Sequence, residues 1–222
     1  MKVLVYPFTD RPGLEKYMGI FSGWSIDNKA CMFVDPRDIR HHPLSYLRAE
    51  QDNTIIILGH CTEGSGYLRS QESHQRGDVE EGPGQTLSAS QLVSLLRDLG
   101  MHDNTVSRIK CMNCNSGMYY EGLYGPEASF ATRFKMALSA QGFGSIAVLG
   151  YMGSLVLMPR PKPKDGVPHR KFAILNTSQG KKAFRGKMLR FSAIGYEGVD
   201  KATADLMQKI VRDFDGDTGI KL

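Results

Sequence analysis

The sequence lacks a long apolar run, and this bounds the class of protein. No stretch of the 222 residues approaches the roughly 18 apolar residues of a transmembrane helix. The opening MKVLVYPFTDRPG is interrupted too early by charge and proline for a signal peptide. Internal repeats are also absent. The length and the 41% hydrophobic and 23% charged content are typical of a globular domain. We therefore expect a soluble, single-domain protein over residues 1–222.

Cysteine is scarce, with four in the chain. So few cysteines in a chain of this length do not form a disulfide framework, so we expect free thiols. The compartment should then be reducing, as the cytoplasm is. Cys31 lies within a predicted strand and is expected in the core.

Acidic residues are nearly missing from residues 160–190. This segment holds ten lysines and arginines against Asp165, a net charge of +9. The whole chain has a net charge of +5, so the remainder is mildly acidic at −4. A basic segment of this kind favours a polyanionic ligand over general binding to nucleic acid, and a solvated basic face is the alternative.

Apolar runs bounded by turn residues predict buried strands, with helical periodicity between them. Ser88 and Gln91 form a capping-box pattern at the start of one helix, and Pro126 is expected to start another. This alternation predicts an α/β fold, a three-layer sandwich with a mainly parallel sheet and helices on both faces. The strands are expected at 2–8, 29–34, 53–59, 106–113 and 145–149, and the helices at 14–21, 88–99 and 126–142.

The chain changes character after about residue 152. PRPKPKDG is expected to be a connection, and KFAIL and KMLRFS are expected to form two strands of a basic flap. An amphipathic helix is expected over 199–214. The prediction is thus a core over 1–152, with a basic flap and a C-terminal helix over 153–222.

Two reactive side chains follow predicted strands. His60 comes after the strand at 53–59, and Cys114 comes after the strand at 106–113. Ligands of parallel sheets bind beyond the carboxyl ends of the strands, where both residues are expected. An imidazole beside a thiol can accept its proton and later protonate a leaving amine. We therefore predict a catalytic dyad in which Cys114 is the nucleophile and His60 the base.

These residues carry a resemblance to a known family. Gly59-His60, a capped helix, and then Cys114-Asn115-Ser116-Gly117 resemble the caspase-like cysteine peptidases of clan CD. The order LSASQLVSLLRDLG, RIKCMNC, SFATRFKMALSAQG, SIAVLGY is most similar to the self-processing cysteine protease domains of large bacterial toxins. The resemblance covers residues 53 to about 152. It implies a caspase-like fold, peptide-bond hydrolysis and a protein or peptide as substrate. It also implies a toxin or effector context, in which the protein would be delivered into a host cytosol rather than remain in the cytoplasm.

The same resemblance implies an oxyanion hole and an activator. The backbone amides of Cys61 and Cys114 would be the oxyanion donors. Members of the family usually have glycine where this chain has Cys61. In the toxin domains a basic C-terminal flap binds inositol hexakisphosphate, which implies a similar site here, carried over by composition and position only. No cofactor is required; the candidate ligands of the polyanion are Lys171, Lys181, Lys182, Arg185 and Lys187.

Other interpretations remain open. The departure at Cys61 supports a catalytically inactive polyanion-binding or protein-interaction module on the same fold. Alternation along the strand predicts that Cys111 is a core thiol. A zinc site from His60, Cys61, Cys111 and Cys114 has suitable ligand types, but His60 and Cys61 should point to opposite sides, so we predict no metal. A redox pair of Cys111 and Cys114 is disfavoured because Cys111 lies within its strand.

Overall fold

The structure is a computed structural model. It describes the backbone of most of the chain up to residue 191, and side chains mainly up to residue 151. The described backbone comprises residues 1–25, 31–61, 66–71, 86–114, 116–117, 120–122, 125–127, 129–151, 154–164, 167–177, 180–185 and 188–191. Side chains are described for residues 1–19, 21, 32–61, 66–71, 86–114, 116–117 and 129–151.

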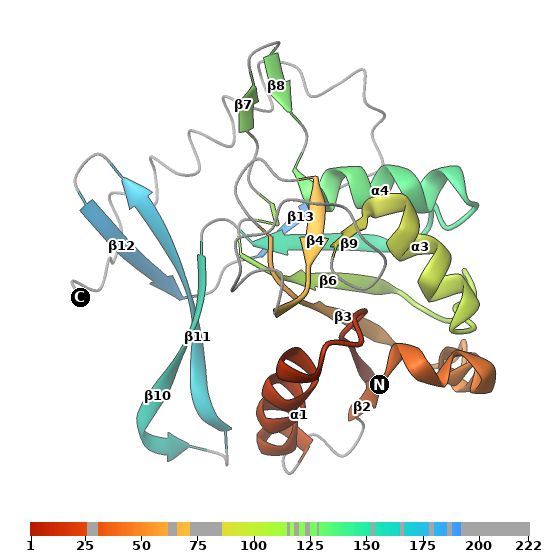
Figure 1. Ribbon diagram of the computed structural model, residues 1–222, viewed down its shortest axis with the longest axis horizontal. Helices are drawn as coiled ribbons and strands as arrows, with labels where there is room; N and C mark the ends of the chain where they lie inside the picture. The colour runs from red at the N-terminus through yellow and green to blue at the C-terminus, as the bar shows by residue number, and fades with distance from the viewer. Residues whose placement is uncertain are drawn as a thin grey trace.

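A six-stranded sheet forms the centre of the molecule (Figure 1), in the order β13-β9-β6-β3-β1-β2. Its first five strands in chain order pair in parallel, and β13 pairs antiparallel with β9. The predicted α/β class and mainly parallel sheet are therefore confirmed. The strands are β1 (Lys2–Val5), β2 (Cys31–Val34), β3 (Thr54–Leu58), β6 (Arg108–Met112), β9 (Ala147–Tyr151) and β13 (Met188–Phe191).

Burial explains why these runs form strands. All five residues of β3 are buried, as a central strand covered on both faces requires. The first five strands fall within or beside the predicted ranges. The direction of the connections changes between β1, which leads outward to β2, and β3, which leads to β6 and β9. The carboxyl ends of β1 and β3 thus meet at a topological switch point, where open α/β sheets bind ligands.

Within the described residues, three helices cover the sheet: α1 (Arg11–Ser25), α3 (Ala89–Asp98) and α4 (Phe130–Ala140). Right-handed crossovers place α1 on one face and α3 and α4 on the other. The capping box of Ser88 and Gln91 is confirmed at the start of α3. The prediction that Pro126 starts a helix is wrong: Pro126 lies in strand β8 (Gly125–Glu127), and α4 begins after Ser129, whose hydroxyl accepts from Thr132 N–H. A hydroxyl cap defines this start better than the proline does.

Short elements fill the connections. Two 3₁₀ turns, Pro36–His41 and Pro43–Tyr46, follow β2. Strand β4 (Tyr67–Arg69) pairs antiparallel with β5 (Thr86–Ser88), and β7 (Tyr120–Gly122) pairs antiparallel with β8. None of these short strands is predicted from the sequence, because runs of three residues carry too little periodicity to be recognised.

The C-terminal part differs from its prediction. PRPKPK is the second half of strand β10 (Ser154–Lys164) rather than a connection. Strands β10, β11 (Val167–Thr177) and β12 (Gly180–Arg185) form a separate antiparallel sheet, drawn from teal (β10) to blue (β12) in Figure 1. β10 is an edge strand and its register shifts between Pro159 and Lys164, which is where a sheet accommodates proline.

The expected flap hairpin of KFAIL and KMLRFS is also wrong. KFAIL lies in β11, but its partners are β10 and β12, and MLRF forms β13 in the main sheet. The polar segment GKKAFR, expected to separate two strands, is itself the strand β12. Strand β13 pairs with β9 along its whole length, from Met188 opposite Tyr151 to Phe191 opposite Val148. The helix predicted over 199–214 lies outside the described residues.

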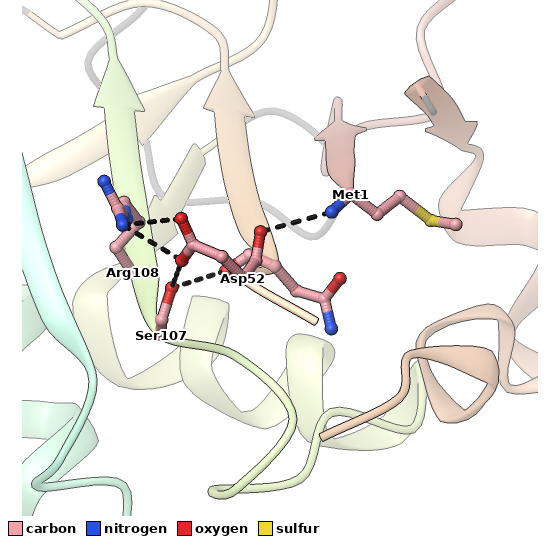
Figure 2. Close-up of polar contacts among 5 residues, drawn as sticks. Met1, Asp52, Ser107 and Arg108 are labelled. Atoms are coloured by element: carbon pink, nitrogen blue, oxygen red, sulfur yellow. Dashed lines mark hydrogen bonds and ion pairs between the residues drawn. The ribbon is translucent and has the colours of Figure 1, made fainter. Parts of the chain in front are cut away.

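The amino ends of the strands are joined by a polar cluster (Figure 2). Asp52 accepts hydrogen bonds from the Ser107 hydroxyl (2.5 Å) and from Arg108 (2.8 and 2.9 Å). The Met1 amino group donates to the Asp52 carbonyl (3.2 Å). These contacts connect the starts of β1, β3 and β6. Within the described residues, no helix is long and apolar enough to cross a membrane.

Candidate active site

His60 occupies the residue position two places beyond β3. Gly59 has φ of 145°, a conformation that side-chain-bearing residues rarely adopt. A Cβ atom at this position would also lie 3.1 Å from the Arg69 carbonyl oxygen. His60 then exchanges two backbone hydrogen bonds with Arg69 (2.9 and 2.8 Å). The glycine therefore turns the chain from β3 onto β4 and places the imidazole at the carboxyl edge of the sheet.

Gln71 connects His60 to helix α1. The side-chain oxygen of Gln71 lies 2.8 Å from Nε2 of His60 and accepts a hydrogen bond of 2.5 Å from Nζ of Lys16. A lysine ammonium group can only donate, so the Gln71 atom that it contacts must be the oxygen. Nε2 of His60 must then donate to the same oxygen. In the neutral imidazole this leaves Nδ1 as the proton acceptor.

Two tyrosines support this arrangement. The Tyr6 hydroxyl accepts from the Gln71 backbone N–H (2.8 Å) and donates to Asp10 (2.5 Å). The Tyr17 hydroxyl donates to the Gly59 carbonyl (3.2 Å). Burial raises the pKa of both phenols well above the ordinary value of 10, and for Tyr6 the bond to Asp10 adds to the rise. Both hydroxyls therefore remain protonated donors that hold the strand end and Gln71.

Cys114 lies in the turn that follows β6. Ser116, which is fully buried, ties this turn to the sheet, since its hydroxyl donates to the Cys111 carbonyl (2.9 Å) and accepts from the Tyr151 N–H (3.0 Å). The Gly117 N–H donates to the Tyr151 carbonyl (2.8 Å). A Cβ atom at Gly150 would lie 2.9 Å from the Gly117 backbone, so only glycine permits this approach. Strands β6 and β9 thus both hold the turn that contains Cys114.

The three described thiols have different surroundings. Cys111 is fully buried and Cys61 is 5% exposed, whereas Cys114 is partly exposed. Burial raises the pKa of Cys61 and of Cys111 well above the ordinary value of 9.0. None of the three forms a disulfide, and Cys111 is a core thiol, as expected. The side chain of Cys31 lies outside the described residues. Cys114 is therefore the described thiol that a substrate can approach.

The sheet register brings the two predicted catalytic residues to the same level. Leu58 of β3 pairs with Met112 of β6, and His60 and Cys114 each follow two residues later. Neighbouring strands lie about 4.8 Å apart. Cys114 also interacts electrostatically with Lys16 and Tyr17 of α1 and with Cys61. Lys16 therefore has a connection to both residues. It donates to Gln71, which accepts from His60, and its charge interacts with Cys114.

Cys61, the residue after His60, does not have a glycine-like backbone. Among the described non-glycine residues, only His42 has a positive φ, so Cys61 adopts an ordinary conformation.

Next to Cys114, the side-chain amide of Asn113 is fully buried and has no hydrogen-bond partner among the described residues. An unpaired buried amide is costly, and we have no structural account of it.

The predicted polyanion ligands lie in the smaller sheet. Lys171 is on β11, and Lys181, Lys182 and Arg185 are on β12. Lys187 lies outside the described residues. In the register, Arg185 pairs with Phe172 and Lys182 with Leu175. The two-residue period of a strand assigns positions 171 and 182 to one face of this sheet and positions 181 and 185 to the other. The four positions therefore do not form one row.

Sequence reasoning missed Lys16 and Gln71. Lys16 is on the exposed side of a helix, where lysine needs no special role, and Gln71 lies in a segment expected to be a loop. Asp10 carried a better indication, because its position before Arg11-Pro12 fits a helix start, and its carboxylate accepts from the Gly13 N–H (3.0 Å). The contact of Gln71 with His60 depends on the β3–β4 turn and has no marker in the sequence.

Within the described residues, no group of three or more histidine, cysteine, aspartate or glutamate side chains could hold a metal ion. The chain matches no model of a known protein family and no curated protein.

Proposed function

We propose that the protein is a cysteine peptidase with Cys114 as nucleophile and His60 as base. The observation that carries the proposal is the shared register of β3 and β6, which brings both residues to one level at the carboxyl edge of the sheet. The partial exposure of Cys114, beside two buried thiols, supports the same assignment. A thiol next to an imidazole is the minimum that nucleophilic catalysis of acyl transfer requires.

The chemistry follows from this pair. Nδ1 of His60 takes the proton of the Cys114 thiol, and the sulfur attacks the carbonyl carbon of a peptide bond. The tetrahedral intermediate collapses with cleavage of the C–N bond, and the imidazolium returns its proton to the leaving amine. Water, activated by the same imidazole, then attacks the thioester and releases the carboxylic acid and the thiol.

The oxyanion of the intermediate needs backbone donors near Cys114. By resemblance these are the N–H groups of Cys61 and Cys114. Since Cys61 has an ordinary backbone conformation, its N–H serves this role only if the oxyanion sits differently from its place beside a glycine, or if substrate changes the local backbone. The caspase-like arrangement of the fold belongs to the same proposal and is supported by the strand order β2-β1-β3-β6-β9-β13.

The decisive experiment is covalent trapping. A library of peptide acyloxymethyl ketones should label one residue, Cys114, and the library members that label fastest define the cleavage specificity. Peptide mapping by mass spectrometry locates the adduct. Label on Cys61 or Cys111, or no label on any thiol while the protein is folded, would overturn the assignment and favour an inactive interaction module.

We also propose that a polyanion such as inositol hexakisphosphate regulates this peptidase through the strands that follow residue 153. The segment 160–190 has a net charge of +9, which opposes its ordering until an anion neutralises it. Two residues separate β12 from β13, and Met188 of β13 pairs with Tyr151, which holds the Cys114 turn. Ordering of the smaller sheet therefore has a short backbone route to the nucleophile.

Inositol hexakisphosphate is expected to raise the melting temperature and the rate of Cys114 alkylation together, as linkage requires when the anion binds the ordered state. Inositol serves as the uncharged control. Stabilisation without a change in alkylation would reduce the proposal to a plain anion site. Absence of stabilisation at low salt would leave a solvated basic surface.

A further inference from the structure

The side chain of Gln71 is held between two polar groups at the site. Its oxygen accepts from a lysine and from an imidazole, while its backbone N–H donates to Tyr6, and the residue is 8% exposed. An amide side chain has two ends of nearly equal shape, one accepting and one donating. The end that faces His60 decides which imidazole nitrogen carries the proton.

Lys16 determines which end of the Gln71 amide faces His60. If the Gln71 amide were rotated by half a turn, its NH₂ group would face the Lys16 ammonium group, and two donors would oppose each other. The rotated amide would also donate to Nε2 of His60, which moves the imidazole proton to Nδ1. The ammonium group of Lys16 thus excludes the orientation in which Nδ1 cannot act as a base.

We propose that Lys16 and Gln71 are positioning residues for His60: Lys16 holds the Gln71 oxygen toward Nε2, which keeps the proton on Nε2 and the accepting lone pair on Nδ1. The kinetic consequence rests on the proposed peptidase function. The tautomer itself does not, so it can be tested separately. Neither residue has to touch the substrate for this role.

Two features make the effect specific to orientation rather than to folding. The Gln71 backbone is held by Tyr6, which is itself held by Asp10, so Gln71 stays in place when Lys16 is removed. Lys16 is on the surface of α1, and the partial burial of its ammonium group lowers its pKa, while its interaction with Cys114 raises it. Replacing this side chain therefore removes a donor without opening the core.

The kinetic test compares Lys16→Met with the double variant Lys16→Met/Gln71→Glu. Lys16→Met is expected to lower kcat/KM about 10- to 100-fold, as part of the general-base contribution is lost. A carboxylate only accepts hydrogen bonds, so the Lys16→Met/Gln71→Glu variant should regain most of the activity. Arg11→Met is the matched control, because Arg11 lies on the same helix and contacts Glu15 at the surface. Unchanged activity of Lys16→Met, or a double variant as slow as Lys16→Met, would overturn the proposal.

The second test is spectroscopic. Long-range ¹⁵N–¹H spectra of histidine-labelled Cys114→Ala protein should show Nε2 of His60 as the protonated nitrogen, with a shift toward Nδ1–H in the Lys16→Met background. An Nδ1–H tautomer with Lys16 present would overturn the inference even if the peptidase is active. A protein without peptidase activity but with the Nε2–H tautomer would overturn the proposed function and leave the positioning role standing.

Discussion

The two edges of the main sheet carry similar polar residues in different surroundings. At the amino edge, Asp52, Ser107 and Arg108 form a cluster open to solvent (Figure 2). At the carboxyl edge, Lys16, Gln71 and His60 form a chain of hydrogen bonds that is partly buried. Solvent screens the first group, so its ion pair contributes little, while burial strengthens the second. We therefore expect substitutions at the carboxyl edge to change chemistry, and those at the amino edge to change stability slightly.

The sharpest test of this comparison is the substitution of the proposed nucleophile, Cys114. Cys114→Ala should abolish hydrolysis, because no other described thiol is both partly exposed and at the strand end. Cys111→Ala should retain most activity, since Cys111 is fully buried. Initial rates on the best trapped peptide sequence measure both. An active Cys114 variant beside a dead Cys111 variant would show that the assignment of the strand end is wrong.

The next largest effect is expected for the proposed base, His60. His60→Ala should slow acylation by about 10²- to 10⁴-fold, the range of general acid–base catalysis, while the protein remains folded. The rate of iodoacetamide alkylation of Cys114 should fall in the same variant. The matched control is His41→Ala, because His41 lies at an exposed turn. His42→Ala is unsuitable, because the His42 ring bonds the Asp98 carbonyl at the end of α3. Equal acylation rates with and without His60 would eliminate the dyad.

Ser116 provides the stability counterpart at the carboxyl edge. Ser116→Ala leaves the Cys111 carbonyl and the Tyr151 N–H without their buried partner, a cost of about 1–3 kcal/mol. Urea denaturation measures it. Ser107→Ala at the exposed amino edge is the matched control and should cost less, since water replaces its hydroxyl. A larger loss at Ser107 would invert the comparison.

The smallest effect is expected for Asp52. Hydrogen bonds from Ser107 and Arg108 lower its pKa below the ordinary value of 3.8. Because the folded-state pKa is depressed, the stabilisation is fully present above that value and is lost as pH falls through the folded-state pKa. Asp52→Asn should therefore lower the melting temperature slightly at pH 7, and the difference should shrink below about pH 4. A difference that is constant with pH would mean that charge plays no part.

Sequence reasoning recovered the elements whose burial is written in local pattern. The run Ile55 to Leu58 is apolar throughout and forms a central strand, and the capping box at Ser88 marks the start of α3. It also placed His60 and Cys114 at strand ends. Their shared level depends on the pairing of β3 with β6, which follows from topology once the sheet is assumed.

The failures have a common cause, which is that long-range pairing overrides local composition. Prolines at positions 159, 161 and 163 suggest a connection, yet an edge strand accepts them. The pattern of MLRF fits a flap strand and a strand of the main sheet equally well. Its place is determined by pairing with β9, which the local sequence does not show. The role of Gln71 likewise depends on its contact with Lys16, which lies 55 residues earlier in the chain.

The position of β13 has a consequence for the synthesis of the chain. The strand, helices and turns around Cys114 are complete once residue 151 has been made, but the outer side of β9 acquires its partner only when residues 188–191 emerge. Until then its backbone N–H and C=O groups are exposed, and such an edge templates intermolecular pairing. Nascent or truncated chains that end between residues 152 and 187 are therefore expected to aggregate more readily than chains that extend past residue 191.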